Sequence, residues 1–314
     1  MTSLSDAAVR RLQEVIDLPH PGSRYEIHEL LGRGGMGAVY RATDTTLGRD
    51  VALKVLTTGS GSPEIASRLA REAKVLARLE HPGIVAVHDA GTLQDGRPFY
   101  VMRLVHGRRL DEFARATGRG ELLRVFLRIC DAVAYAHARG VIHRDLNPSN
   151  VMVGEFGDVL VLDWGVAKLA GDSGLRATVP PTSEVTTADG LVVGTPGFMP
   201  PEQASGAAAT ADARSDVYGL GAILSFVVGL AGARPRPLVA ITERAMAAEP
   251  ADRYQTVDAL AADVRHWMDG ERVDAYRERA LERVGRIYRR NQTLILLVLA
   301  YAVMRVTILL WRGV

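Results

Sequence analysis

The pattern of apolar and polar positions divides the chain into a strand-rich part and a helix-rich part. Before Gly107, alternating apolar residues predict strands at 25–31, 38–43, 50–56, 84–87 and 99–104. In the same part, a helical period predicts one helix, at 64–79. After Gly107, helical periods predict helices at 121–139, 216–230, 237–248 and 256–269. Between the first two of these helices, short apolar runs at 151–153 and 159–162 predict a hairpin. We therefore expect a β-rich lobe followed by an α-rich lobe, with the boundary at 105–107.

Composition excludes several classes of protein. The chain has 314 residues, of which 47% are hydrophobic and 24% charged, as in folded globular proteins. A net charge of +2 gives no global attraction to nucleic acid, and we expect no nucleic-acid partner. Cys130 is the single cysteine, so neither a disulfide framework nor a cysteine-rich metal site can form. Residues 1–22 lack the apolar core of a signal peptide, and we expect a short helix and a linker there.

A long apolar stretch, 293–311, lies near the C-terminus. As a helix it would measure about 28 Å, close to the thickness of a bilayer core, and it contains one charge, Arg305. Its Leu, Ile and Val residues favour insertion by roughly 3–6 kcal/mol, against a cost of about 2.5–3.5 kcal/mol for the arginine. The residues just before it are basic, at Arg283, Arg286, Arg289 and Arg290. We expect a single-pass membrane protein with the preceding domain in the cytoplasm. The alternative, a helix lying in the interface or packed on the domain, stays open.

A glycine cluster lies between the first two predicted strands. It runs Gly32-Arg33-Gly34-Gly35-Met36-Gly37-Ala38-Val39. Glycines let backbone N–H groups approach a phosphate, because no Cβ stands in the way. An ordinary hairpin turn would have the same composition, but a dinucleotide site is disfavoured because no helix follows directly. Lys54 ends the Val-Ala-Leu-Lys sequence of the next strand, where a lysine alone would indicate only a surface position.

An acidic residue, Glu72, lies on the apolar face of the helix predicted at 64–79. It shares that face with Leu69 and Leu76, three and four residues away. A carboxylate in such a place is costly unless a cation meets it, and Lys54 is the candidate. The alternative is a glutamate at the edge of the stripe that reaches water.

Two further motifs flank the predicted hairpin. His143-Arg144-Asp145-Leu146-Asn147-Pro148-Ser149-Asn150 ends at its first strand, and Asp163-Trp164-Gly165 begins after its second. Antiparallel pairing brings Asn150 and Asp163 side by side, and oxygen ligands of this kind suit Mg²⁺. Asp145 is close enough in sequence to serve the same site as a base. Either motif alone would indicate an ordinary turn or cap, whereas the ordered set is highly specific.

The ordered set of motifs resembles that of the bacterial, eukaryotic-like serine/threonine protein kinases. The resemblance covers about 25–268. It implies an α+β, bilobal protein-kinase fold, to which the apolar stretch adds one C-terminal transmembrane helix. The expected division of the chain is an N-terminal extension, a β-rich lobe, an α-rich lobe, a basic linker and the apolar segment, at 1–24, 25–105, 106–268, 269–292 and 293–311.

The resemblance also implies a role for each matching residue. ATP and Mg²⁺ would be the cofactors, with Asn150 and Asp163 as metal ligands. Lys54, paired with Glu72, would hold the α- and β-phosphates, and Asp145 would accept the proton of the substrate hydroxyl. Ala52 and Met152 would enclose adenine, and Met102 would be the gatekeeper. The full set of nucleotide-binding residues would be Leu31, Gly32, Arg33, Gly34, Gly35, Met36, Gly37, Ala38, Val39, Ala52, Lys54, Met102, Arg103, Val105 and Met152.

The chain departs from the family's pattern at a few places. Trp164 stands where phenylalanine is usual, and we expect it to fill the same apolar slot. Asn147 stands where a lysine is usual near the γ-phosphate, and we expect its amide to supply part of that stabilisation. Only a short segment separates the helix ending near Leu230 from the one starting near Pro237, where family members usually place another helix.

Other segments resemble the parts of the family that face protein substrates. These are 194–198 and Pro200-Pro201-Glu202. By the same resemblance, Glu202 would pair with Arg253, and Asp216 would brace the catalytic loop. Both segments argue against a small-molecule phosphotransferase.

The sequence favours a kinase that transfers the γ-phosphate of ATP to serine or threonine hydroxyls of proteins. We expect its own loop at 171–193 to be phosphorylated, in trans within a dimer. The membrane would be a further partner, through 293–311. The alternative is a membrane-tethered pseudokinase that binds ATP or acts as a scaffold, for which Asn147 and the missing helix are the reasons.

Overall fold

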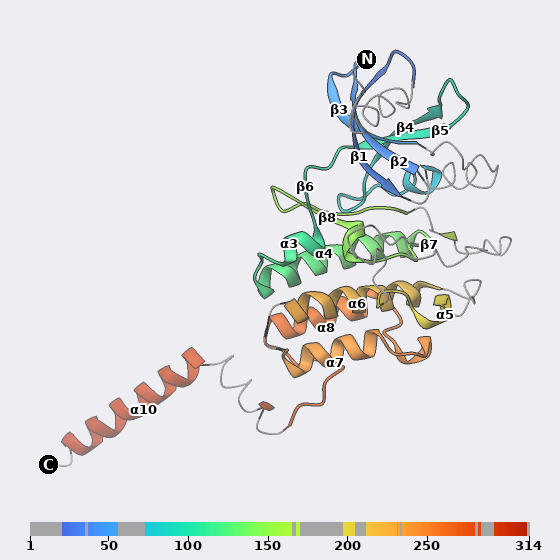
Figure 1. Cartoon of the computed structure of the whole chain (residues 1–314). Coiled ribbons are helices and arrows are strands. Elements are labelled where there is room, and N and C mark those ends of the chain that lie inside the picture. Colours follow the sequence, from blue (N-terminus) through green and yellow to red (C-terminus); the bar gives the residue numbers. More distant parts are fainter. Residues whose placement is uncertain are drawn as a thin grey trace, which may run out of the picture.

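The computed structural model describes residues 21–34, 37–55, 73–164, 168–169, 197–204, 212–230, 232, 234–279, 282–283 and 292–312. These residues form two lobes stacked one above the other and a C-terminal helix that stands apart from both (Figure 1). The upper lobe is a sheet and the lower lobe is mainly helical, as the sequence predicts.

The N-terminal lobe is built on an antiparallel sheet. Its strands are β1 (Tyr25–Gly34), β2 (Gly37–Asp44), β3 (Arg49–Val55), β4 (Val87–Thr92) and β5 (Pro98–Arg103). They are ordered β1-β2-β3-β5-β4. Alternate residues bury a small apolar core, in which Val51, Leu53 and Val101 are fully buried. The sheet confirms, with shifted ends, the strands predicted at 25–31, 38–43, 50–56 and 99–104.

The strand predicted at 84–87 is misplaced. The strand of the sheet, β4, begins only at Val87, and Ile84 forms an isolated bridge to Val161 of the other lobe. The sequence of β4, VHDAGT, alternates in exposure but carries few apolar residues, so it gave no apolar period. Ile84 and Val85 are apolar for another reason, since both are buried in the core that continues into the C-terminal lobe.

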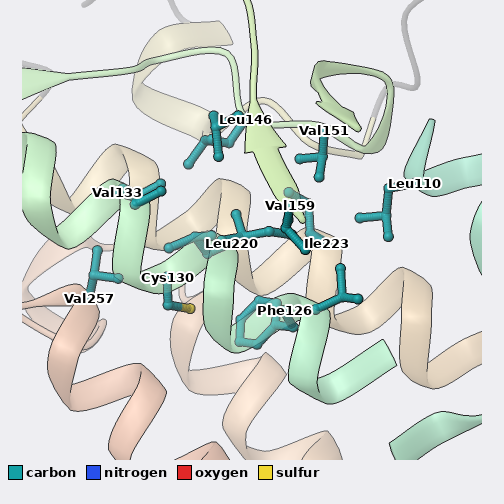
Figure 2. Close-up of a cluster of buried hydrophobic side chains, with 14 of the residues drawn as sticks. Leu110, Phe126, Cys130, Val133, Leu146, Val151, Val159, Leu220, Ile223 and Val257 are labelled. Carbon is teal, nitrogen blue, oxygen red and sulfur yellow. The ribbon is translucent and has the colours of Figure 1, made fainter. Parts of the chain in front are cut away.

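The C-terminal lobe is a bundle of helices. They are α3 (Leu110–Ala114), α4 (Arg119–Ala138), α5 (Pro201–Ala204), α6 (Ala213–Leu230), α7 (Arg236–Ala245) and α8 (Val257–Met268). Phe126, Leu220 and Ile223 are fully buried where α4 meets α6 (Figure 2). Cys130 is buried beside them, and burial raises the pKa of its thiol, as expected of a structural cysteine. The bundle confirms the helices predicted at 121–139, 216–230, 237–248 and 256–269.

Short strands cover the face of the bundle that meets the N-terminal lobe. β8 (Val151–Gly154) and β9 (Val159–Val161) form the predicted hairpin, with β6 (Gly107–Arg109) at its edge. β7 (Val141–Ile142) pairs with β10 (Lys168–Leu169), and a single 3₁₀ turn, η1 (Pro148–Asn150), precedes β8. At the end of the hairpin opposite its turn, the backbone N–H of Leu162 donates to the carbonyl oxygen of Asn150 at 2.8 Å. This bond brings the two predicted motifs together.

The chain stays packed on the lower lobe after α8. Val273 is buried, and the backbone N–H groups of Asp274 and Ala275 donate to the buried carboxylate of Asp263 at 2.8 and 3.0 Å. Tyr276 then donates its hydroxyl to Glu282. The packed part of the chain therefore extends beyond 268, where the resemblance placed the end of the domain.

The last helix, α10 (Gln292–Arg312), exposes its apolar residues. Large side chains such as Leu297, Val303 and Trp311 are more than half exposed. Among the described residues, α6 is the helix long and apolar enough to cross a membrane, but most of it is buried in the lower lobe. The apolar part of α10 that can be described with its side chains is shorter, Leu296–Ile308. The membrane span at 293–311 therefore stays a prediction.

Candidate active site

The glycine-rich segment forms the end of the β1–β2 hairpin. Gly32 pairs with Val39 and Gly34 with Gly37, while Gly35 and Met36 lie outside the described residues. A Cβ built on Gly32 would meet no atom within 4 Å, so this glycine is not required by packing inside the sheet. Its backbone instead faces open space, which is what a phosphate needs to approach closely.

The residues assigned to adenine lie on both lobes. Ala52 of β3 is buried and pairs across the sheet with Met102 of β5, which is half-buried. Arg103 and Val105 follow in the segment that joins the lobes. Met152 is half-buried on β8 and pairs with Arg109 of β6. The sheet thus places Ala52 beside Met102, and the hairpin places Met152 at the top of the lower lobe.

Lys54 and Asp163 meet across the boundary between the lobes. The Lys54 ammonium is buried in the upper lobe and lies 2.7 Å from Oδ1 of Asp163. Burial alone would raise the pKa of Asp163, but the charge and hydrogen bond of Lys54 hold it below its usual value. Asp163 is therefore ionised, and its second oxygen remains available to a cation.

The predicted partner of Lys54 on the helix at 64–79 was Glu72. The described part of that helix covers only 73–76, where Leu76 is buried as predicted. Glu72 lies outside the described residues. Its pairing with Lys54 therefore stays a prediction.

Two residues at the site hold unusual backbone conformations. Arg144 has φ of 71° and Asp163 has φ of 56°, and they are the non-glycine residues with positive φ in the described part of the chain. Such conformations cost about 1–3 kcal/mol each and persist only where the surroundings impose them. They mark these two loops as the strained part of the fold, which is typical of functional sites.

His143 joins the two loops. Its Nδ1 accepts from the backbone N–H of Asp145 at 3.2 Å, so Nε2 must carry the proton that it donates to the carbonyl of Leu162 at 2.9 Å. Its ring also packs on that of Trp164, with centroids 4.6 Å apart. Trp164 is 1% exposed and thus fills a buried apolar slot, as expected.

Asp216 braces the catalytic loop from α6. Its carboxylate accepts from the backbone N–H groups of His143 at 2.8 Å and Arg144 at 2.7 Å, and from Nε2 of His137 at 2.7 Å. Burial would raise the pKa of Asp216, but the contact with His137 keeps it below its usual value. A buried, charged carboxylate with this many donors fixes the backbone on which Asp145 stands.

Asp145 is held by the side-chain amides of two asparagines. Asn150 donates to its Oδ2 at 3.0 Å and to its carbonyl oxygen at 2.8 Å, and Asn147 donates to its Oδ1 at 3.1 Å. Burial raises the pKa of Asp145, against the opposing effects of His143 and of the two amides. A fixed carboxylate with a raised pKa suits a general base.

The oxygens near Asp145 fit a magnesium ion. The amide nitrogen of Asn150 is engaged with Asp145, which leaves its Oδ1 as the atom for a cation. Together with the carboxylate of Asp163, this gives the one or two protein oxygens that Mg²⁺ uses when phosphates and water supply the rest. The described residues contain no cluster of three or more His, Cys, Asp or Glu side chains, so a purely protein-built metal cage is not found among them.

A buried ion pair fixes the segment that follows the loop at 171–193. Both oxygens of Glu202 on α5 accept from the guanidinium of Arg253 at 2.8 Å, and Arg253 is fully buried. Ser215 of α6 donates a further bond to Glu202 at 2.9 Å. The pairing of Glu202 with Arg253 is therefore confirmed. Of the predicted substrate-facing residues, 194–196 lie outside the described part.

Sequence reasoning missed two contributors to the site. His137, near the end of α4, supplies the side-chain donor to Asp216, and no local motif marks it. The capping role of Asn147 was also missed, although Asn-Pro at the start of a turn is a recognisable signal, because Asn favours N-caps and Pro favours the next position.

Comparisons with known proteins agree with this geometry. A model of the protein kinase domain family matches residues 25–250. Among curated proteins, the serine/threonine-protein kinase PknD of Protochlamydia amoebophila is 32% identical over 308 residues, covering 82% of this chain and 31% of its own. PknB of Mycolicibacterium smegmatis is 34% identical over 290 residues, covering 82% of this chain and 45% of its own. The chain thus spans less than half the length of these relatives.

A solved structure is similar as well. The kinase domain of Mycobacterium tuberculosis PknI is 28% identical, with a TM-score of 0.58, and the match covers 78% of this chain and 96% of that domain. The fold, the family model and the curated relatives point the same way. The chain belongs to the protein kinase family, among the bacterial serine/threonine protein kinases.

Proposed function

We propose that this chain transfers the γ-phosphate of ATP to serine and threonine hydroxyls of proteins. The observation that carries the proposal is the pair of fixed carboxylates on either side of Asn150. Asp145 is held by the amide of Asn150, and Asp163 is held by Lys54 at 2.7 Å just beyond the hairpin that Asn150 directly precedes. One carboxylate serves the hydroxyl and the other the metal side of the nucleotide.

Each side chain has a separate task in this reaction. Asp145 accepts the hydroxyl proton of the substrate and orients its oxygen. Lys54, Gly32 and the other glycines would hold the phosphates, and Asn150 and Asp163 would supply oxygen ligands to magnesium. When bound, the metal neutralises charge on the phosphates. Asp216 and His143 keep the loop rigid, because a general base must stay within hydrogen-bond reach of its proton.

The experiment is transfer of labelled phosphate by the full chain in detergent micelles. Asp145→Asn removes the base and should lower turnover by about 10²–10⁴, while nucleotide binding stays largely intact. Equal activity of both proteins would remove Asp145 from its role. A wild-type chain that binds ATP but transfers no phosphate would support the pseudokinase alternative.

We also propose that α10 anchors the chain in a membrane. Its apolar side chains are exposed all along the described part, and the sequence before it is basic from Arg283 to Arg290. Burial of this surface in lipid would remove apolar area from water, and no described residue of this chain covers that area. By the positive-inside rule, these charges favour a cytoplasmic location for the kinase lobes. Fractionation tests this, since a span resists carbonate washing whereas an interfacial helix is released.

The loop at 171–193 is proposed as a site of autophosphorylation. Thr178, Thr182, Ser183, Thr186 and Thr187 lie there, outside the described residues. Arg144, next to the base, supplies a guanidinium that a phosphate could meet. Mass spectrometry of protein incubated with ATP tests this, with Asp145→Asn as the control. A dimer is proposed only for this step, and mixing active and inactive chains distinguishes transfer in trans from transfer in cis.

A further inference from the structure

Both ends of the Asn147 amide are engaged within the catalytic loop. Its Oδ1 accepts from the backbone N–H groups of Ser149 at 3.0 Å and Asn150 at 3.2 Å, which caps η1. Its Nδ2 donates to the carbonyl oxygen of Asp145 at 3.3 Å and to Oδ1 of that residue at 3.1 Å. These partners fix the orientation of the amide, because backbone N–H groups need an acceptor and the oxygens of Asp145 need a donor.

The result is a symmetrical grip on the base. Asn147 donates to Oδ1 of Asp145 and Asn150 donates to Oδ2, so each carboxylate oxygen has its own amide donor. Asn147 also bonds to the backbone N–H of Asn150, so the same side chain supports the second holder. The turn that presents Asn150 and the side-chain orientation of Asp145 are thereby coupled through one residue.

We propose that Asn147 is a positioning residue that aligns Asp145, rather than a weaker substitute for a lysine at the γ-phosphate. The inference rests on the proposed kinase activity. Its amide has no group left over for a phosphate unless it breaks the contacts that hold the base. A base displaced by about 1 Å can cost about 10² in rate, so alignment of Asp145 alone gives Asn147 a large effect on the reaction.

Asparagine is the residue that chemistry requires for this double task. The backbone of Asn147 is extended, with φ of −152°, as an N-cap demands, and Pro148 follows at the first position of the turn. Aspartate and serine would cap the turn but would lack the amide that holds Asp145. Lysine would offer donors but no acceptor for Ser149 and Asn150. Of these side chains, the short amide is the one that supplies an acceptor together with two donor hydrogens.

The test compares variants that separate the cap from the donor. Asn147→Ser and Asn147→Asp keep an acceptor for the turn, and agreement between them excludes the added charge as the cause. We expect an unchanged Tm, unchanged amide exchange over 145–151, a kcat lowered about 10–100-fold, and a KM for ATP within about twofold of wild type. Asn147→Lys should speed exchange in that segment and leave kcat at or below that of wild type.

A matched control separates positioning from loss of stability. Thr256 caps α8, accepting from the backbone N–H of Ala259 at 3.2 Å, away from the catalytic loop. Thr256→Ala should lower Tm by about 2–4 °C without lowering kcat.

Three results would decide against the inference or its basis. Wild-type kcat in Asn147→Ser would leave Asn147 with a capping role only. A kcat raised several-fold in Asn147→Lys would show that the chain lacks a positive charge at the γ-phosphate, which is the alternative interpretation. Absence of phosphate transfer by the wild-type chain would instead overturn the proposed activity, and the exchange measurements would still report whether Asn147 caps the turn.

Discussion

The indole N–H of Trp164 donates to the carbonyl oxygen of Val161 at 3.2 Å. Both residues are buried, so this bond satisfies an acceptor that water cannot reach. A phenylalanine at this position would fill most of the same space but could not donate. The tryptophan therefore ties the loop that carries Asp163 to the end of β9.

Trp164→Phe should destabilise the fold although phenylalanine is usual in the family. Leaving the Val161 carbonyl without its donor costs about 1–3 kcal/mol. We expect a lower Tm in thermal unfolding, and Trp267→Phe, a change at a half-buried tryptophan of α8, serves as the control. An unchanged Tm in Trp164→Phe would mean that the indole bond does not contribute.

Breaking the pair formed by Glu202 and Arg253 on one side should strongly destabilise the fold. Arg253 has no exposed side-chain area, so Glu202→Ala leaves a buried guanidinium uncompensated, at a cost of about 3–5 kcal/mol. Asp131→Ala removes a carboxylate that pairs with Arg265 at 3.1 Å, but at an exposed site, where pairs contribute about 0–1 kcal/mol. Chemical denaturation of both variants gives the comparison, and similar losses would contradict the buried role.

Two truncations should show how much the packed residues after α8 contribute to stability. Ending the chain at 268 removes Val273, whose burial contributes about 1.5–3 kcal/mol, and two backbone donors to Asp263. Ending it at 283 retains all of these contacts. We expect the longer form to unfold at a higher denaturant concentration, and equal midpoints would show that the linker adds no stability.

Stability should fall at acid pH because of Asp216. Its pKa lies below the ordinary value of 3.8 in the folded protein, as His137 outweighs the effect of burial. A group of this kind contributes stability that is fully present above its unfolded pKa and is lost as the pH falls through the lower, folded pKa. The free energy of unfolding should thus decline below about pH 4. Asp216→Asn should be less stable at neutral pH and decline less on acidification; parallel curves would exclude Asp216 as the source.

The fold was predictable where an alternation of apolar residues lay next to a short recognisable motif. The hairpin at 151–162 follows from alternating apolar residues and a turn, and its pairing alone implies that Asn150 and Asp163 are neighbours. Contacts between distant helices were not predictable in this way. His137 meets Asp216 across 79 positions of sequence, and its helical pattern is that of any residue near a helix end.

The β4 strand shows the opposite failure. Its residues alternate in exposure, but its sequence does not alternate in polarity and contains Gly91, so it is held in the sheet by its backbone bonds to β5 rather than by an apolar face. The apolar residues just before it, Ile84 and Val85, belong to a different core. Sequence periodicity detects burial, and burial need not coincide with a strand.

The packing of the chain up to Arg283 sets how far the kinase lobes can travel from α10. The backbone N–H of Arg279 donates to Glu282, which also meets Arg236 of α7 at 3.7 Å, so the lower lobe holds this part of the chain. Between Arg283 and the start of α10 at Gln292 lie only residues 284–291, which span at most about 30 Å when fully extended. With α10 in a bilayer, the active site around Asp145 would stay within a limited distance of the lipid surface. A protein diffusing in the same membrane would meet it at a high effective concentration, whereas a freely soluble one would meet it rarely. Location at the same membrane would then favour some substrates over others before any contact with the active site is made.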